Sequence, residues 1–153
     1  MCNIVVLCCF DIHGTLLCFS KTFKFLYKKE WFRKMSDYFS NSTLLVALFT
    51  LFLIKNKKIV ESMQRFHDSS FYKVCLLTNS YKNSKWILNF ILRRIKRINC
   101  FDDIICRDYI FETEIEHKIK KIRKYDIRLI FDDNPDIVNA IKETNCKSIS
   151  YIT

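Results

Sequence analysis

The chain has few of the residues that interrupt regular structure: its 153 residues include one glycine, Gly14, and one proline, Pro135. This composition excludes collagen-like chains and Gly/Pro-rich disordered chains. Half of the residues are apolar, which is enough for a packed core. The length suits one compact domain over 1–153, with little room for a second.

The cysteines lack the spacing of a zinc site or a disulfide framework. None of the eight is in a CxxC pair, and Cys8, Cys9 and Cys75 fall in apolar runs that are predicted to be buried strands. Free thiols in a reducing compartment are expected. The N-terminus also lacks the basic segment and cleavage site of a secretory signal peptide. These features favour a cytoplasmic protein.

The apolar run 43–54 is twelve residues long, short of the roughly 20 residues that cross a bilayer. It is predicted to be a buried or an interfacial helix. Lys55, Lys57 and Lys58 follow it. Basic residues there suit a helix C-terminus and, equally, contact with an anionic membrane surface.

The formal net charge is +10, from 26 Lys and Arg against 16 Asp and Glu. Such a charge attracts anions, which include phosphorylated small molecules, nucleic acid and acidic membranes. A general bias toward lysine explains the charge as well, so charge alone does not identify a partner.

Short apolar runs alternate with helical patterns along the chain. Strands are predicted at 4–10, 74–80, 101–106, 127–133 and 147–152, and helices at 19–35, 59–66, 86–98, 114–125 and 137–144. Strands separated by helices need crossover connections, which predicts an α/β fold with a Rossmann-like parallel sheet flanked by helices. Residues 19–70 are interpreted as a helical insertion after the first strand.

Three of the predicted strands end in polar side chains, and parallel strands bring such ends to one edge of the sheet. In chain order these residues are Asp11, Thr78, Asn79, Ser80, Asp132 and Asp133. Clustered carboxylates repel one another unless a cation or proton lies between them, and oxygen ligands select a hard ion such as Mg²⁺. With the ion neutralising a phosphoryl group, Asp11 can attack phosphorus to give an aspartyl-phosphate that water hydrolyses.

Each candidate residue also has a purely structural interpretation. Asp11 suits a turn cap, Thr78 suits a helix N-cap, and Lys118 suits a solvated helix face because other lysines surround it. His67 and His117 belong to no recognisable pattern of partners. These alternatives stay open at the level of sequence.

The stretch FDIHGTL, 10–16, resembles the nucleophile motif of the haloacid dehalogenase (HAD) superfamily, commonly written DxDGTL, with His13 in place of the second Asp. IFDDNPD, 130–136, resembles the acidic fourth motif. VCLLTNS, 74–80, is similar to the phosphate-binding second motif, and HKIKKI, 117–122, is similar to the third. The four occur in the family's order and span most of the chain.

This resemblance implies a HAD-like fold, a small helical cap at 19–70, and roles for particular residues. Asp11 would be the nucleophile, His13 the general acid and base, and Lys118 the lysine of the third motif. Thr78 and Asn79 would bind the substrate phosphate. An imidazole of ordinary pKa both donates and accepts protons at neutral pH.

The resemblance also implies a cofactor, Mg²⁺, held by Asp11, Asp132 and Asp133 with the backbone carbonyl of His13. The predicted function is a Mg-dependent phosphatase acting through an aspartyl-phosphate. A cap after the first motif closes the site, which favours a small phosphorylated metabolite as substrate.

Two alternatives remain. DDNPDIVNAIKE, 132–143, resembles the phosphatase domain of polynucleotide kinase 3'-phosphatases, which suits a basic protein acting on nucleic-acid ends. RRIKR, 93–97, is a phosphate-contacting strip without an aromatic stacking platform. His13 motivates the other alternative, a catalytically impaired HAD-like binding protein.

Overall fold

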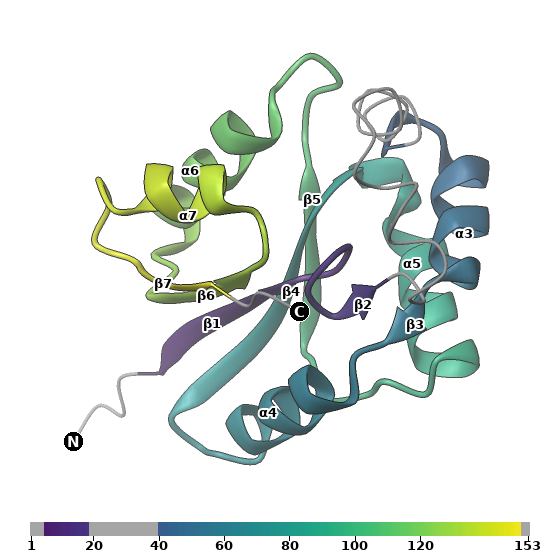
Figure 1. Cartoon of the computed structure of the whole chain (residues 1–153), viewed down its shortest axis with the longest axis horizontal. Helices are drawn as coiled ribbons and strands as arrows, with labels where there is room; N and C mark the ends of the chain where they lie inside the picture. Colours follow the sequence, from purple (N-terminus) through teal and green to yellow (C-terminus); the bar gives the residue numbers. More distant parts are fainter. Residues whose placement is uncertain (1–4, 19–39, 151–153) are drawn as a thin grey trace.

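The computed structural model describes residues 5–18 and 40–150, which form a parallel β-sheet with helices on both faces (Figure 1). The strands lie in the order β5-β4-β1-β6-β7, and all neighbours are parallel. Their bounds are β1 Val6–Asp11, β4 Tyr72–Tyr81, β5 Asp103–Arg107, β6 Leu129–Asp132 and β7 Lys147–Ser150. The predicted Rossmann-like α/β sheet is thus confirmed.

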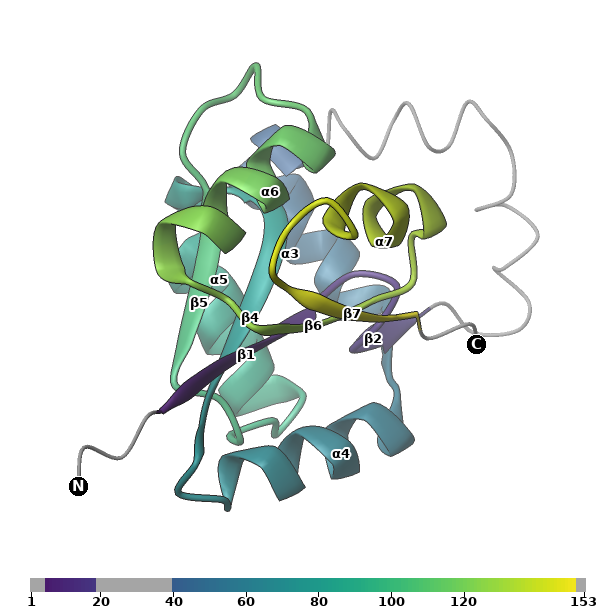
Figure 2. The same ribbon diagram turned by 90° about the vertical axis from the view of Figure 1, so that its left-hand side faces the viewer.

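The helices lie on opposite faces of this sheet, α6 and α7 on one and α3, α4 and α5 on the other (Figures 1 and 2). Their bounds are α3 Thr43–Phe52, α4 Lys57–His67, α5 Lys85–Phe90, α6 Glu114–Tyr125 and α7 Pro135–Ile141. A 3₁₀ turn, η1 Lys82–Ser84, precedes α5, and a π-helical turn, η2 Ile91–Ile95, continues it. The helix predicted over 19–35 lies outside the described residues. Among the described helices, none has the length and apolarity needed to cross a membrane.

Side chains of β1 alternate between two hydrophobic cores, because successive residues of a strand point to opposite faces. Cys8 and Phe10 belong to the core under α3, α4 and α5, whereas Cys9 belongs to the core under α6 and α7. Phe10 stacks on Phe131 of β6 with ring centroids 4.3 Å apart. The same alternation turns Asp11 toward α6. Cys8, Cys9 and Cys75 are buried free thiols, as expected.

The described part of the predicted insertion packs into the main core. Val46, Leu53, Ile59 and Met63 are all buried there. The helix predicted within 43–54 is confirmed, but it ends at Phe52 because Ile54 pairs with Cys18 in a short antiparallel strand pair, β2 Leu17–Cys18 and β3 Ile54–Lys55. The assignment of 19–70 as a cap stays a prediction, since 19–39 are not described.

Helix α6 has the bounds that the sequence predicts, and its first turn explains them. Thr113 is the N-cap: its Oγ1 accepts a hydrogen bond from Glu116 N at 3.2 Å, and Glu116 Oε2 accepts one from Thr113 N at 2.9 Å. This reciprocal capping box satisfies two otherwise unpaired N–H groups. The buried side of α6 contains His117, Lys118 and Lys121, so the helix directs cationic and imidazole side chains toward the sheet.

Candidate active site

Asp11 and Asp132 lie side by side at the carboxyl ends of two neighbouring strands. The register of β1 and β6 pairs Phe10 with Phe131, so the next residue of each strand is a carboxylate. Both are almost fully buried. Two adjacent carboxylates in such a place require a cation or a proton between them.

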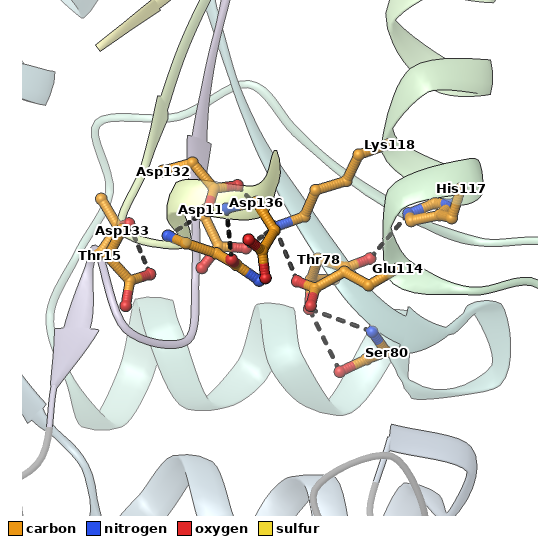
Figure 3. A network of polar contacts seen from close by, with 11 residues as sticks. Asp11, Thr15, Thr78, Ser80, Glu114, His117, Lys118, Asp132, Asp133 and Asp136 are labelled. Atoms are coloured by element: carbon orange, nitrogen blue, oxygen red, sulfur yellow. Dashed lines mark hydrogen bonds and ion pairs between the residues drawn. The ribbon is translucent and has the colours of Figure 1, made fainter. Parts of the chain in front are cut away.

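Lys118 of α6 supplies that cation. Its Nζ lies 2.8 Å from Asp11 Oδ1 and 2.7 Å from Asp132 Oδ2, and Figure 3 shows the side chain reaching from α6 to both strand ends. Glu114, one helical turn earlier, places Oε1 2.9 Å from the same nitrogen. Lys118 is only 1% exposed, so its interpretation as a residue of a solvated helix face is wrong.

The charges of this cluster are coupled. Burial by itself lowers the pKa of Lys118, but the carboxylates of Asp11, Glu114 and Asp132 raise it well above its usual value, so the ammonium stays charged. Burial raises the pKa of Asp11 well above its usual range, and the nearby ammonium of Lys118 opposes that rise. Carboxylates therefore outnumber ammonium groups in a buried place, which favours a further cation or a bound proton there.

Asp133 faces the turn that follows β1. Its Oδ1 accepts a hydrogen bond from Thr15 Oγ1 at 3.2 Å, and burial together with Asp132 raises its pKa to about 6. Gly14 has φ +109°, and a Cβ at this position would collide with the carboxylate of Asp133. The chain's one glycine therefore stands where the turn passes against this carboxylate, which leaves no space for a side chain.

His13 contacts α3 rather than the Lys118 cluster. Its Nε2 lies 3.1 Å from Thr50 Oγ1, and that hydroxyl donates to Val46 O at 2.6 Å. Since the hydroxyl proton is used, His13 Nε2 is the donor and Nδ1 is the nitrogen with the lone pair. Burial lowers the pKa of His13 to about 4, so the ring is neutral at neutral pH. The sequence-based expectation that His13 acts as both acid and base assumes an ordinary pKa. With the lowered pKa, the ring can accept a proton at neutral pH but carries no extra proton to donate.

Thr78 lies inside β4, one residue beyond the position that pairs with Asp11. Its Oγ1 donates to Ser80 Oγ at 3.2 Å and accepts from Ser80 N at 3.2 Å. The strand continues to Tyr81, so the N-cap interpretation of Thr78 is wrong. Asn79 Oδ1 is buried without a hydrogen-bond partner in the described part of the chain.

Comparison with solved structures identifies the architecture. A chain of the Pnkp1/Rnl/Hen1 RNA repair complex superposes with a TM-score of 0.67 and 13% identity, over 96% of this chain and 42% of that one. A predicted HAD-like family hydrolase from Porphyromonas gingivalis gives a TM-score of 0.56 and 14% identity, over 96% of this chain and 91% of that one. The chain has the haloacid dehalogenase fold.

A HAD family enzyme from Bacteroides thetaiotaomicron, in complex with magnesium and inorganic phosphate, is also similar, with a TM-score of 0.56 and 10% identity over 95% of this chain and 93% of that one. The chain spans less than half of the RNA repair protein that it matches. Neither the scan against family models nor the search of curated proteins finds a match.

In this HAD fold, Lys118 directly contacts two of the other predicted site residues, Asp11 and Asp132. Asp133 lies beside the adjoining turn, Thr78 and Asn79 lie on the neighbouring strand β4, and His13 contacts α3. Within residues 5–18 and 40–150, no three His, Cys, Asp or Glu side chains form a ready metal-binding group.

Sequence reasoning missed two residues of the site. Glu114 precedes Lys118 by four positions on a predicted helix, a spacing that identifies an ion pair, so this contact could have been predicted. His117 Nε2 donates to the carbonyl of Thr78 at 3.0 Å and fixes α6 to β4. No sequence signal pairs these two residues, because their contact depends on how α6 docks.

Replacing Lys118 with Met is expected to lower the free energy of unfolding by about 3–5 kcal/mol at pH 7, since two buried carboxylates lose their cation. Without the ammonium, the folded-state pKa values of these carboxyls rise. Protonation then favours the folded state, so the loss should shrink as the pH falls from 7 to 5. Urea unfolding of wild type and Lys118→Met at pH 7 and pH 5 measures this loss of stability.

The matched control is Lys120→Met, on the same helix, where the exposed lysine pairs with Glu112. It should leave stability nearly unchanged. Equal effects of the two substitutions, or a Lys118→Met effect that does not depend on pH, would contradict the role assigned to the buried ammonium.

Proposed function

We propose that this protein is a phosphohydrolase in which Asp11 is the nucleophile. The observation that carries the proposal is the placement of Lys118 Nζ within 2.8 Å of Asp11 and 2.7 Å of Asp132, buried at the carboxyl edge of a HAD-fold sheet. A buried carboxylate beside a fixed ammonium is suited to attack an electrophile whose other oxygens carry negative charge. The phosphoryl group of a phosphate ester fits that description.

The first step forms an aspartyl-phosphate. A carboxylate oxygen of Asp11 attacks phosphorus, and the bond from phosphorus to the ester oxygen breaks, so the alkoxide leaves with its electron pair and takes a proton from solvent water. Oδ1 is held by Lys118, whereas Oδ2 accepts no hydrogen bond from the described part of the chain. We assign the attack to Oδ2. Lys118 is proposed to balance the charge of the phosphoryl oxygens. The hydroxyl of Thr78 is proposed to donate to one of them in place of Ser80 Oγ.

The second step hydrolyses this intermediate. Water attacks phosphorus, inorganic phosphate leaves, and Asp11 returns to its carboxylate form. His13 is proposed to accept the proton of the attacking water at Nδ1, because its Nε2 already donates to Thr50. A neutral imidazole is in the correct form to do so.

Mg²⁺ is the proposed cofactor, and the chemistry of the donor set supports it. Asp11, Asp132 and Asp133 offer only carboxylate oxygens, which suit a hard divalent ion, and their charges exceed that of Lys118. These residues, with the backbone carbonyl of His13, would hold the ion. When bound, it supplies positive charge next to the transferred phosphoryl group.

Two substrate classes are compatible with this site. A small phosphorylated metabolite is favoured if 19–70 closes over it as a cap. Nucleic-acid ends are the second candidate, supported by the structural likeness to a chain of an RNA repair complex and by the net charge of +10. A HAD-like binding protein without activity is the remaining alternative. If it is correct, the wild-type protein should not hydrolyse a phosphate ester.

Replacing Asp11 with Asn is expected to abolish hydrolysis of p-nitrophenyl phosphate, lowering kcat by at least about a thousandfold, because the nucleophile is lost. Wild-type activity should require Mg²⁺ and disappear when EDTA is added. The matched control is Asp136→Asn, at the start of α7, which should retain activity. Equal turnover by wild type and Asp11→Asn would eliminate the enzyme proposal in favour of a binding protein.

Three substitutions at position 13 test proton transfer separately from structure. His13→Gln keeps an N–H donor for Thr50 but cannot accept a proton at neutral pH, so its kcat should fall by about a hundredfold. His13→Ala should fall at least as far, while His13→Asp should preserve or raise activity. Initial rates at saturating substrate measure these effects. If His13→Gln matched wild type, His13 would have no role as a base.

A further inference from the structure

The segment 82–97, which contains η1, α5 and η2, is basic at both ends. It contains six cationic residues and no Asp or Glu. The cations are Lys82, Lys85, Arg93, Arg94, Lys96 and Arg97. The segment begins directly after β4, the strand next to β1 in the sheet. One end of it therefore lies close to the edge of the sheet that holds Asp11.

This segment also exposes two aromatic rings. Trp86 is 66% exposed and Phe90 is 52% exposed, and their spacing of four residues places them on one face of the helix. Lys82 lies in the preceding 3₁₀ turn and Arg94 in the π-helical turn that follows, and both side chains are exposed. The sequence-based interpretation of RRIKR as a strip without a stacking platform is therefore incomplete, because the platform lies one to two turns earlier.

Trp86 lines a groove of about 790 Å³ together with Lys82, Asn83 and Asn89. Two acidic residues line the same groove, but both are already engaged. Asp103 pairs with Lys85 at 2.7 Å, and Asp102 Oδ2 accepts a hydrogen bond from Val74 N at 2.8 Å. Arg93 lines the groove as well, and its Nε donates to Asn89 Oδ1 at 2.9 Å. The groups that remain for a ligand are the indole face of Trp86, the amide of Asn83, the NH2 group of Asn89 and the ammonium of Lys82.

We propose that this groove binds single-stranded nucleic acid. A base can stack on Trp86, and the amides of Asn83 and Asn89 can hydrogen-bond base edges. Lys82 in the groove, and the exposed Arg94 outside its lining, can contact phosphates. A membrane is the less suitable occupant, because a bilayer surface cannot enter a groove and an interfacial helix presents a continuous apolar face. Here amide side chains alternate with the aromatic ones.

The proposal names a substrate class for the proposed phosphohydrolase, and to that extent rests on it, but the binding itself requires no hydrolysis. The two can therefore fail separately. Asp11→Asn should bind an oligonucleotide as wild type does, and Trp86→Ala should hydrolyse p-nitrophenyl phosphate as wild type does. Wild-type protein that binds the oligonucleotide but hydrolyses no phosphate ester would refute the phosphohydrolase. Wild-type protein that hydrolyses the ester but does not bind the oligonucleotide would refute the groove.

Fluorescence anisotropy of a labelled 12-nucleotide oligouridine, titrated with the full chain, tests the groove. Trp86→Ala should weaken binding by about tenfold or more, because it removes a stacking platform. Trp86→Phe should restore most of the affinity. The control is Phe111→Ala, which removes an aromatic ring that is 97% exposed in the loop before α6, and it should leave binding unchanged.

Salt dependence tests the phosphate contacts. The double substitution Lys82→Gln/Arg94→Gln should reduce the slope of log affinity against log salt by about 1–2. Lys57→Gln/Lys58→Gln removes the same charge from exposed positions on α4 and should change the slope less.

Two results would overturn the proposal. One is oligouridine binding that is absent in the wild type or equal in wild type and Trp86→Ala. The other is Trp86-dependent binding to phosphatidylserine vesicles without binding to oligouridine, which would make the face a membrane contact instead.

Discussion

The buried ammonium of Lys118 is the constraint on which the site depends. It is nearly inaccessible to water, and its three carboxylate partners lie within 2.9 Å. A charge removed from water in this way is stable only when its partners are in place. The fold must therefore bring the ends of β1 and β6 together and dock α6 so that Lys118 lies between them. The HAD-fold sheet and the capping box at Thr113 both serve that requirement.

The same geometry separates the proposed chemistry into two parts. Asp11, Asp132 and Lys118 form a charged cluster on the α6 side of the sheet. His13, two residues beyond Asp11, is instead held from the opposite layer by Thr50 of α3. The proposed nucleophile is thus positioned by one layer and the proposed base by the other. A change in the packing of α3 would move the base while leaving the charged cluster intact.

The convergence of Asp11 and Asp132 could be predicted from the sequence, because apolar runs locate the strands and parallel strands share an edge. Lys118 is expected there only from the resemblance to the HAD third motif. The contact of His13 with Thr50 could not be predicted, because it depends on how a helix 37 residues away packs against the turn. The exposure of Trp86 could not be predicted from the sequence either. An amphipathic pattern identifies a helix, but which of its aromatic side chains stay exposed depends on how α5 packs in the fold. Short local patterns in the sequence thus predict which residues end the strands. How the helices pack determines the contact of His13 and the exposure of Trp86.

Trapping the covalent intermediate tests the central claim most directly. Wild-type protein would be mixed with p-nitrophenyl phosphate and Mg²⁺, quenched with acid and treated with borohydride, which reduces an acyl phosphate to an alcohol. Peptide mass spectrometry should then find homoserine at position 11 and unmodified Asp132 and Asp133. Reduction at another carboxylate, or substrate turnover with no residue reduced, would contradict the assignment of Asp11 as the nucleophile.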